Sequence, residues 1–465
     1  MLNLEEIFMK AMSLREIAAA VDGQYFGNIE NLELQVSGVA IDSRKIEEGF
    51  LFIPIKGARV DGHTFIPQVM EKGALCTLSE RPLQEASYSY ILVESCEQAL
   101  KDLAEHYRKA LDIKVVGITG SVGKTSTKEM IASVLSQKYN VLKTAGNFNN
   151  EIGLPLTIFN IREEHEVAVL EMGISDFGEM SRLAKMARPD ICVITNIGLC
   201  HLENLGDRDG ILKAKTEMFD YRQPNAKIIL NGDDDKLITV KEWEGCAPVY
   251  FGLSKELDAY ATDIQSLSLR GTACNLHLGA QEIKVTIPIP GHHMVFNALA
   301  GALVGQELGL SLQEIKAGIE SLVPVSGRNN LIETDSLLII DDCYNANPVS
   351  MKASLDVLAT ADSRKVAILG DMYELGTNEK ELHYEVGVHA AEKKIDLVVC
   401  IGELSEHTAK GVKDAATKVV YFSAKADFLN EVEDWIQAGD TILVKASHGM
   451  AFPEIVERLA QLNLR

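Results

Sequence analysis

Short apolar runs alternate with helical stretches over most of this chain. Between residues 112 and 323, the runs KVVGIT, EVAVLEM, ICVITNI and KIILN are apolar throughout, and segments with a period near 3.6 lie between them. Strands that are apolar on both faces are typical of parallel sheets covered by helices on both sides. The pattern therefore predicts a parallel α/β domain. Near residues 255–290 the alternation becomes hairpin-like, and a helix resumes at His293.

Two further regions flank this domain. From residue 324 the alternation restarts with SLLIIDD, KVAILGD, IDLVVCIG, KVVYFS and TILVKAS, which predicts a doubly wound, Rossmann-like domain. The boundary is placed in SLVPVSGR because proline and glycine interrupt the pattern there. The first part mixes the helix SLREIAAAV, strand-like runs and a closing helix, CEQALKDLAEHYRKAL. The sequence thus predicts an α/β protein of three domains, at 1–111, 112–323 and 324–465.

Length and charge narrow the class of protein. A chain of 465 residues corresponds to roughly three domains, and 46% hydrophobic residues with a mean hydropathy of +0.03 are ordinary for globular material. The 45 basic and 67 acidic residues leave a net charge of −22, which repels a phosphate backbone. We expect no nucleic-acid partner. An anionic substrate would need a local cluster of Arg, Lys and backbone N–H groups.

Cysteine usage and apolar run lengths predict the compartment. The eight cysteines contain no C-x-x-C pair, which favours a reducing environment. The N-terminal MLNLEEIFMK is acidic and lacks the apolar core of a secretory signal. The longest weakly polar stretch, from Met294 to Gly305, is shorter than the roughly 20 residues that span a bilayer. We expect a cytoplasmic protein without membrane insertion.

The strongest chemical signal is the loop GITGSVGKTS, which follows an apolar strand and opens a helix. Glycines let successive N–H groups and the helix N-terminus face an anion. Lys124 supplies a charge for terminal phosphates, and the Thr125 hydroxyl suits Mg²⁺. The spacing departs from G-x4-GK-[ST], because Ile118 stands five residues before Gly123. A glycine turn followed by a helical lysine would need all these features to coincide by chance. The predicted ATP-binding residues here are Gly117, Thr119, Gly120, Ser121, Val122, Gly123, Lys124, Thr125 and Ser126.

Further motifs follow the predicted strands of the middle domain. They are the segment TAGNFNN, Glu171 at the end of EVAVLEM, His201 in TNIGLCH and Lys215 in a helix. Because the carboxyl ends of parallel strands meet at one crevice, we expect these side chains to point toward the nucleotide. Each has an ordinary alternative: Glu171 could cap the helix near Asp176, His201 could be a structural histidine, and Lys215 could lie on a solvated helix face.

Together, the motifs GITGSVGKTS, TxGNxNN, EMG, TNIGxxH and AK resemble the central domain of the Mur ligases of peptidoglycan synthesis. The segments DDCYNANP and GDMYELG resemble the MurF type of this family, and the DNPR-type signature of the diaminopimelate-adding type is not found. At the N-terminal end, DSR and DGH are similar to the family's uridine-nucleotide domain. The resemblance covers essentially the whole chain.

The resemblance implies an ATP-dependent ligase that adds D-alanyl-D-alanine to UDP-MurNAc-tripeptide through an acyl phosphate. The products would be UDP-MurNAc-pentapeptide, ADP and phosphate. It implies Lys124, Glu171, His201 and Lys215 as catalytic residues and two Mg²⁺ ions, with Thr125, Glu171 and His201 as ligands. Imidazole is an unusual Mg²⁺ ligand, so only the family context supports His201 in this role. Lys215 would carry a carbamate, as N6-carboxylysine.

The resemblance also assigns the substrate contacts. The residues expected at the UDP-sugar are Ser43, Arg44, Lys56, Asn147, Asn149 and Asn150. Those expected at D-alanyl-D-alanine are Tyr344, Asn345 and Asn347, and those that complete the ATP site are Asn297, Arg328 and Asp342. Arg328 and Asp342 would arrive only when the third domain closes, which keeps water from the acyl phosphate.

Ordinary interpretations of these residues stay open. D-S-R can be a surface loop, Asn-Ala-Asn-Pro a turn and helix start, and Asn297 a helix-start asparagine. The chain also departs from the family at two places, with Met294 where an asparagine is common and Lys445-Ala446-Ser447 where K-G-S is common. Both departures concern substrate contacts.

Two other functions compete with this interpretation. A ligase similar to folylpolyglutamate synthetase would share the ATPase core and the acyl-phosphate chemistry, but D-x-YNANP and the DSR segment favour the cell-wall assignment. A catalytically silent nucleotide-binding homologue would have no chemical reason to retain all the catalytic residues. We expect a monomer, and the sequence does not indicate the third amino acid of the tripeptide.

Overall fold

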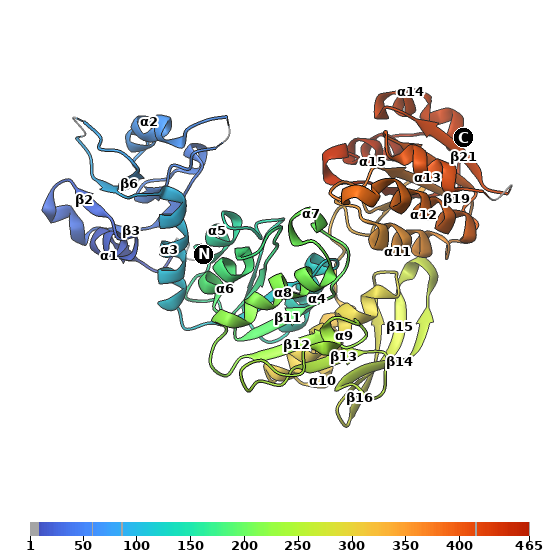
Figure 1. Cartoon of the computed structure of the whole chain (residues 1–465), viewed down its shortest axis with the longest axis horizontal. Helices are drawn as coiled ribbons and strands as arrows, with labels where there is room; N and C mark the ends of the chain where they lie inside the picture. The colour runs from blue at the N-terminus through green and yellow to red at the C-terminus, as the bar shows by residue number, and fades with distance from the viewer. Residues whose placement is uncertain (1–8, 58, 85–86, 414–415, 465) are drawn as a thin grey trace, which may run out of the picture.

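The computed structural model describes residues 9–57, 59–84, 87–413 and 416–464. Three main sheets follow one another along the chain, and Figure 1 shows the N-terminal part in blue, the middle part in green and yellow, and the C-terminal part in orange and red. The N- and C-terminal parts lie apart from one another, and each contacts the middle part. The predicted α/β class with three domains is confirmed. Among the described residues, no helix is long and apolar enough to cross a membrane.

The N-terminal part is built on a five-stranded sheet in the order β2-β7-β6-β5-β4. Strands β4 to β7 pair in parallel and β2 joins antiparallel to β7. The strands are β2 (Gln24–Phe26), β4 (Gly38–Ala40), β5 (Phe50–Phe52), β6 (Cys76–Ser79) and β7 (Tyr90–Leu92), beside a short pair of β1 (Met12–Ser13) and β3 (Gln35–Val36). The helices are α1 (Leu14–Ala20), α2 (Ile66–Glu71) and α3 (Cys96–Lys109). Ser13 and Glu16 form a capping box at α1, as the sequence SLRE favours.

Helix α3 joins the N-terminal and middle parts into one apolar core. The Tyr107 hydroxyl donates to the carbonyl of Ile161 at 2.6 Å, and its ring packs on Phe159. The buried Arg108 donates Nε–H to the carbonyl of Ala187 at 3.1 Å. One apolar cluster contains residues on both sides of residue 111, so the boundary predicted there stays a prediction.

The middle part contains a nine-stranded sheet in the order β16-β15-β14-β13-β12-β11-β8-β10-β9. From β9 to β14 all neighbours pair in parallel, and β14, β15 and β16 form an antiparallel extension of the same sheet, as the alternation near 255–290 predicted. The strands are β8 (Lys114–Thr119), β9 (Val141–Lys143), β10 (Val167–Glu171), β11 (Ile191–Ile194), β12 (Lys227–Asn231), β13 (Val249–Gly252), β14 (Ala259–Ser266), β15 (Thr272–Leu278) and β16 (Gln281–Ile287).

Helices cover both faces of this sheet. Successive residues of β8 belong to different cores: Val115 lies in one apolar cluster, and Val116 and Ile118 in the other. The helices are α4 (Lys124–Leu135), α5 (Gly153–Ile158), α6 (Glu179–Ala187), α7 (Leu202–Leu205), α8 (Arg208–Thr216), α9 (His293–Glu307) and α10 (Leu312–Glu320). This two-sided burial is the reason that the central strands are apolar at every position.

The C-terminal part has a six-stranded sheet in the order β17-β18-β22-β19-β20-β21. The five predicted strands are parallel, and β17 (Asn330–Glu333), which the pattern did not predict, adds antiparallel at the edge. The others are β18 (Leu338–Asp341), β19 (Lys365–Gly370), β20 (Leu397–Ile401), β21 (Lys418–Phe422) and β22 (Thr441–Lys445). The helices are α11 (Pro348–Leu358), α12 (Glu379–Glu392), α13 (Ser405–Gly411), α14 (Lys425–Trp435) and α15 (Pro453–Ala460).

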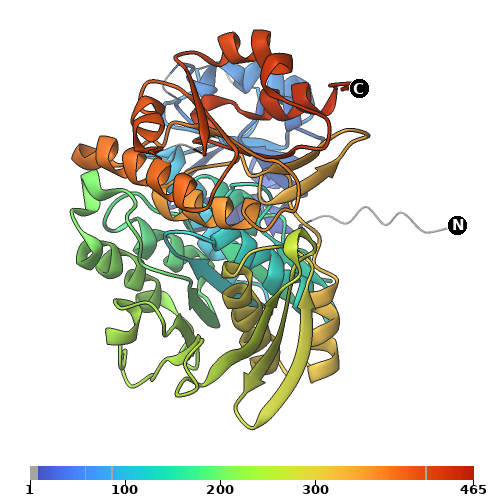
Figure 2. The same cartoon turned by 90° about the vertical axis from the view of Figure 1, so that its right-hand side faces the viewer.

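The C-terminal part contacts the middle part at the end of the β14–β15 hairpin. In that turn Leu269 is buried within the apolar cluster of the C-terminal part, and the Ser268 hydroxyl donates to the carbonyl of Thr360 at 2.6 Å. Figures 1 and 2 both show this hairpin reaching up to the C-terminal part. The hairpin therefore supports the domain that faces the phosphate loop.

Candidate active site

The loop between β8 and α4 is shaped by two glycines with positive φ. Gly120 has φ +152° and lies so close to Thr195 that a Cβ would meet its hydroxyl oxygen at 1.9 Å. Gly123 has φ +83° and directly precedes α4. Gly117, by contrast, lies inside strand β8, where a Cβ would meet Met172, and Thr119 ends that strand with its hydroxyl buried and unpartnered among the described residues. These two predicted ATP contacts thus lie beneath the loop, in the strand.

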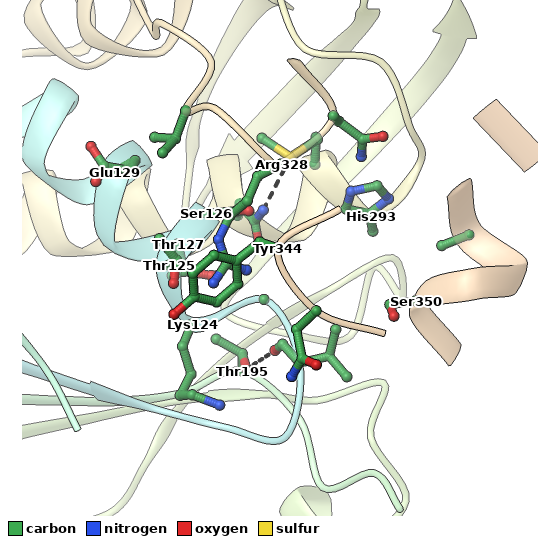
Figure 3. Close-up of a pocket in the computed structure, with 18 of the residues that line it drawn as sticks. Lys124, Thr125, Ser126, Thr127, Glu129, Thr195, His293, Arg328, Tyr344 and Ser350 are labelled. Carbon is green, nitrogen blue, oxygen red and sulfur yellow. Dashed lines mark hydrogen bonds between the residues drawn. The ribbon is translucent and has the colours of Figure 1, made fainter. Parts of the chain in front are cut away.

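The TNIG segment holds the loop in place. The Val122 carbonyl accepts hydrogen bonds from the Thr195 hydroxyl at 2.6 Å and from Asn196 Nδ2 at 2.9 Å, and the Val122 N–H donates to Asn196 Oδ1 at 2.9 Å. Figure 3 draws the Thr195 bond beside the Lys124 side chain. A loop held at both its N–H and C=O groups is organised before any ligand binds.

Lys124 folds back over its own loop. Its Nζ donates to the carbonyl of Gly120 at 2.8 Å. Burial lowers the pKa of Lys124, and the carboxylate of Glu171 opposes this effect. The ammonium is thus held next to the N–H groups that would face a phosphate chain.

Glu171 forms the polar centre of the site at the end of β10. Thr125 donates its hydroxyl to Glu171 Oε2 at 2.9 Å, and Asn149 donates Nδ2–H to Oε1 at 2.8 Å. The alternative role of Glu171 as a helix cap is not seen, because the N–H groups of Ser175 and Asp176 bond to Glu179. A buried carboxylate beside a hydroxyl of a phosphate loop offers the oxygen donors that Mg²⁺ takes together with nucleotide phosphates. Within the described residues, no group of three or more His, Cys, Asp or Glu side chains is placed to hold a metal alone.

His201 and Lys215 both lie close enough to Lys124 to interact with its charge. His201 has φ +50° and its Nδ1 lies 3.3 Å from Oε2 of Glu374 in the C-terminal part. Lys215 is buried with 1% exposure, so the solvated helix-face alternative is wrong. Burial, assisted by the charge of Lys124, lowers the pKa of Lys215 to about 7. Burial also lowers the pKa of His201, against the charge of Glu374.

A cavity of about 480 Å³ opens between the loop and the C-terminal part. The guanidinium of Arg328 stacks over the ring of Tyr344, with 4.1 Å between guanidinium carbon and ring centre, and Figure 3 shows this pair facing Lys124 and Thr125. The lining residues that the sequence predicted are Ser121 to Ser126, Asn147, Asn149, Glu171, Asn297, Arg328, Asp342, Tyr344, Asn345 and Asn347. The third domain therefore already faces the loop in this structure.

Several side chains that were predicted to contact substrates already accept hydrogen bonds from other groups of the protein. Asn347 Oδ1 caps α11 by accepting from the Ser350 N–H at 2.9 Å, and Asn150 Oδ1 accepts from the Gly153 N–H at the start of α5. Asn297 Oδ1 accepts from the Thr127 hydroxyl at 2.9 Å. The ordinary interpretation of Asn-Ala-Asn-Pro as a helix start thus describes the side-chain oxygen of Asn347.

Of the residues predicted at the UDP-sugar, Asn147 and Asn149 line the cavity, whereas Ser43, Arg44 and Lys56 lie in the N-terminal part. Ser43 and Arg44 belong to a single turn of 3-10 helix, where the exposed Arg44 pairs with Asp42 at 2.7 Å. The backbones of Lys56 and Asp61 pair in an isolated antiparallel β-bridge. None of the three lines the cavity.

Sequence reasoning missed other residues of this region. Lys445 donates to Asp342 Oδ2 at 2.6 Å and to the carbonyl of Asn345 at 3.0 Å, so it fixes the turn that presents the predicted dipeptide residues. Glu129 and His293 also line the cavity. The K-A-S motif pointed toward Lys445, whereas nothing local distinguishes Glu129 from the other charged residues of its helix.

The sheets and the loop define an α/β phosphate-loop protein in which the middle and C-terminal parts together line the cavity beside the loop. Three family models match successive parts of the chain. Residues 35–108 match the Mur ligase family catalytic domain, residues 118–305 match the Mur ligase middle domain, and residues 327–448 match the Mur ligase glutamate ligase domain. The chain belongs to the Mur ligase family, and within it to the MurF type.

Similar proteins support the assignment to the MurF type. The chain is 40% identical over 461 residues to the UDP-N-acetylmuramoyl-tripeptide–D-alanyl-D-alanine ligase of Bacillus subtilis, covering 97% of this chain and 99% of that one. It is 35% identical to the enzyme of the same name from Escherichia coli, over 94% and 96% of the two chains. The crystal structure of MurF from Acinetobacter baumannii superposes with a TM-score of 0.90 at 32% identity, over 98% and 100% of the chains. A Mycobacterium tuberculosis folylpolyglutamate synthase shares the fold, with a TM-score of 0.62 at 14% identity over 79% and 95%.

Proposed function

We propose that this chain joins D-alanyl-D-alanine to UDP-MurNAc-tripeptide with consumption of ATP, in peptidoglycan precursor synthesis. The observation that carries the proposal is the Thr125–Glu171 pair beside Lys124, in a cavity that Arg328 and Tyr344 of the C-terminal part complete. The names of the similar proteins supply the substrates. The roles of the three domains, for the uridine nucleotide, ATP and the dipeptide, are part of the proposal.

The proposed chemistry activates a poor electrophile. ATP phosphorylates the terminal carboxylate of the tripeptide, the dipeptide amine attacks the acyl phosphate, and the tetrahedral intermediate releases phosphate. Lys124 neutralises charge that gathers on phosphoryl oxygens, and Arg328 adds a second cation from the C-terminal part. Thr125 and Glu171 would hold Mg²⁺, which supplies electrostatic stabilisation to the transferring phosphoryl group when bound. Apposition of the two domains excludes water from the acyl phosphate.

We further propose that Lys215 carries a carbamate and that His201 serves a second Mg²⁺ ion. A buried amine with a pKa of about 7 is largely neutral at pH 8, and the neutral amine is the form that adds carbon dioxide. Short-chain carboxylic acids should restore activity to Lys215→Ala by replacing the carboxylate. Failure of this rescue would contradict the carbamate.

A phosphate-release assay with paired omissions tests the main proposal. Phosphate release should require UDP-MurNAc-tripeptide and D-alanyl-D-alanine together. Release that does not depend on the dipeptide would overturn the proposal. Release with a folate and glutamate instead would favour the folylpolyglutamate synthase-like alternative, for which the likeness at 14% identity supports the fold alone. The cytoplasmic location, the monomeric state and the lack of a nucleic-acid partner stay predictions.

A further inference from the structure

Helix α4 carries a second lysine, four residues beyond Lys124, that the proposed chemistry does not use. Lys128 is among the largest fully buried side chains, with 1% exposure. Lysine is almost never buried completely unless it is paired. Lys128 does not line the cavity, so its ammonium does not reach the substrates directly.

The ammonium of Lys128 is surrounded by three oxygens from different segments. Its Nζ donates to the carbonyl of Thr144 at 2.7 Å and lies 3.1 Å from Glu129 Oε1 and 3.8 Å from Glu171 Oε2. Glu129, which faces the cavity at one side of Figure 3, pairs through its other oxygen with Lys143. Lys128 thus connects the phosphate-loop helix with the ends of β9 and β10.

Thr144 extends this connection to the backbone of Glu171. Its hydroxyl oxygen accepts the N–H of Glu171 at 3.0 Å, while its own N–H donates to the carbonyl of Val169 at 3.0 Å. Thr144 also begins the segment TAGNFNN, whose Asn149 donates to Glu171 Oε1. Lys128 therefore acts on the carboxylate of Glu171 by charge and, through Thr144, on its main chain.

Without this lysine, Glu171 would lose its one ion-paired lysine among the described residues, and Glu129 would keep only Lys143. Glu171 is 2% exposed, and the cations that face it are Lys128 at 3.8 Å and, as a longer-range charge, Lys124. Removing one member of a buried charge group leaves the others without their partner, and their side chains rearrange. A carboxylate that has rotated away from the site is a poor ligand for a hard cation.

We propose that Lys128 is a positioning residue that holds Glu171 and the Thr144 turn in the arrangement that accepts Mg²⁺. It does so without contact to substrate, since it does not line the cavity. That the site binds Mg²⁺ together with a nucleotide is taken from the proposed function. The role of Lys128 is to hold the metal ligand in place, and not to take part in the chemical step.

Binding of Mn²⁺, used as a paramagnetic substitute for Mg²⁺, tests the proposal apart from activity. Electron paramagnetic resonance titrations would measure the dissociation constant of Mn²⁺ from the full-length protein with ADP bound. Lys128→Met should raise this constant at least tenfold and leave metal-free ADP binding within twofold. The matched control, Lys143→Met, removes the exposed cation of the same Glu129 and should change Mn²⁺ binding less than twofold. Mn²⁺ binding by Lys128→Met that equals the wild type, or is tighter, would overturn the proposal.

A second variant decides the matter if Lys128→Met does not fold. Thr144→Val keeps the shape of the side chain and removes only the acceptor for the Glu171 N–H. It should raise the Mn²⁺ dissociation constant about threefold or more, and an unchanged constant would overturn the proposal. In phosphate release, both variants should need more Mg²⁺ for half-saturation, whereas a purely structural role would lower only the unfolding temperature. If wild-type phosphate release does not depend on the dipeptide, the proposed function fails, but the Mn²⁺ titration still tests Lys128.

Discussion

Thr125 donates its hydroxyl to Glu171 Oε2 at 2.9 Å and so joins the first turn of α4 to the end of β10. The two residues are 46 positions apart in the sequence, and parallel pairing of β8 with β10 brings them together. This relationship places a hydroxyl and a carboxylate on the same side of the phosphate loop, as a Mg²⁺–nucleotide site requires.

We expect Glu171→Gln to reduce phosphate release about 100-fold or more, because an amide keeps the shape but not the charge of the carboxylate. Thr125→Ser, which retains the hydroxyl, is the control and should stay within a few-fold of wild type. The measurement is the initial rate of phosphate release at saturating substrates. Activity of Glu171→Gln close to wild type would exclude Glu171 as a metal ligand.

Lys124→Ala and Arg44→Ala should affect different ligands: the first should impair the use of ATP, and the second the binding of the UDP-sugar. Lys124→Ala should abolish phosphate release and leave UDP-sugar binding largely intact, because the two anions are proposed to bind different domains. Arg44→Ala should weaken UDP-sugar binding, measured by calorimetry, and leave metal-free ADP binding unchanged. Loss of UDP-sugar binding in Lys124→Ala would contradict the proposed division of roles.

Burial of Lys215 predicts a pH-dependent stability. The pKa falls from 10.5 to about 7 on folding, so between these values the unfolded chain holds a proton that the folded chain has lost. The free energy of unfolding therefore rises with pH across this window, by about 1.4 kcal/mol for each pH unit. Lys215→Met lacks this contribution, so its advantage over wild type should be largest below pH 7 and vanish near pH 10.5.

Chemical denaturation in degassed buffer at several pH values measures this effect. Parallel stability curves for the two proteins would show that the buried amine does not titrate as expected. Bicarbonate at pH 8 provides a further control: it should stabilise the wild type and leave Lys215→Met unchanged, because only the wild type has an amine to carbamoylate.

Leu269 offers a test of the contact between the middle and C-terminal parts. Leu269→Ala should destabilise the docked C-terminal part by about 2–3 kcal/mol, as expected for loss of a buried leucine. The dipeptide KM should rise more than the ATP KM, because the proposed dipeptide residues belong to the C-terminal part. Small-angle scattering should report a larger radius of gyration. Equal effects on both KM values would argue against a docking role.

The local pattern of apolar and polar residues predicts most of the strands and helices, but it does not predict which distant segments pack against them. The parallel strands of the middle part and the five parallel strands of the C-terminal part follow from apolar runs, since burial on two faces leaves a local trace in sequence. Strand β17 was not predicted, because it lies at the edge of the C-terminal sheet and three of its four residues are only half-buried. The continuous core around Tyr107 also escaped, because it depends on residues 54 positions apart.

Residue types at short spacing were sufficient to predict the phosphate loop, the catalytic candidates and the family. Tertiary structure alone decided which candidates meet. It joined Thr125 to Glu171 and buried Lys215 and Lys128. The physical reason is that burial and hydrogen bonding are set by strand order and domain contact, which bring distant segments together and leave no local pattern.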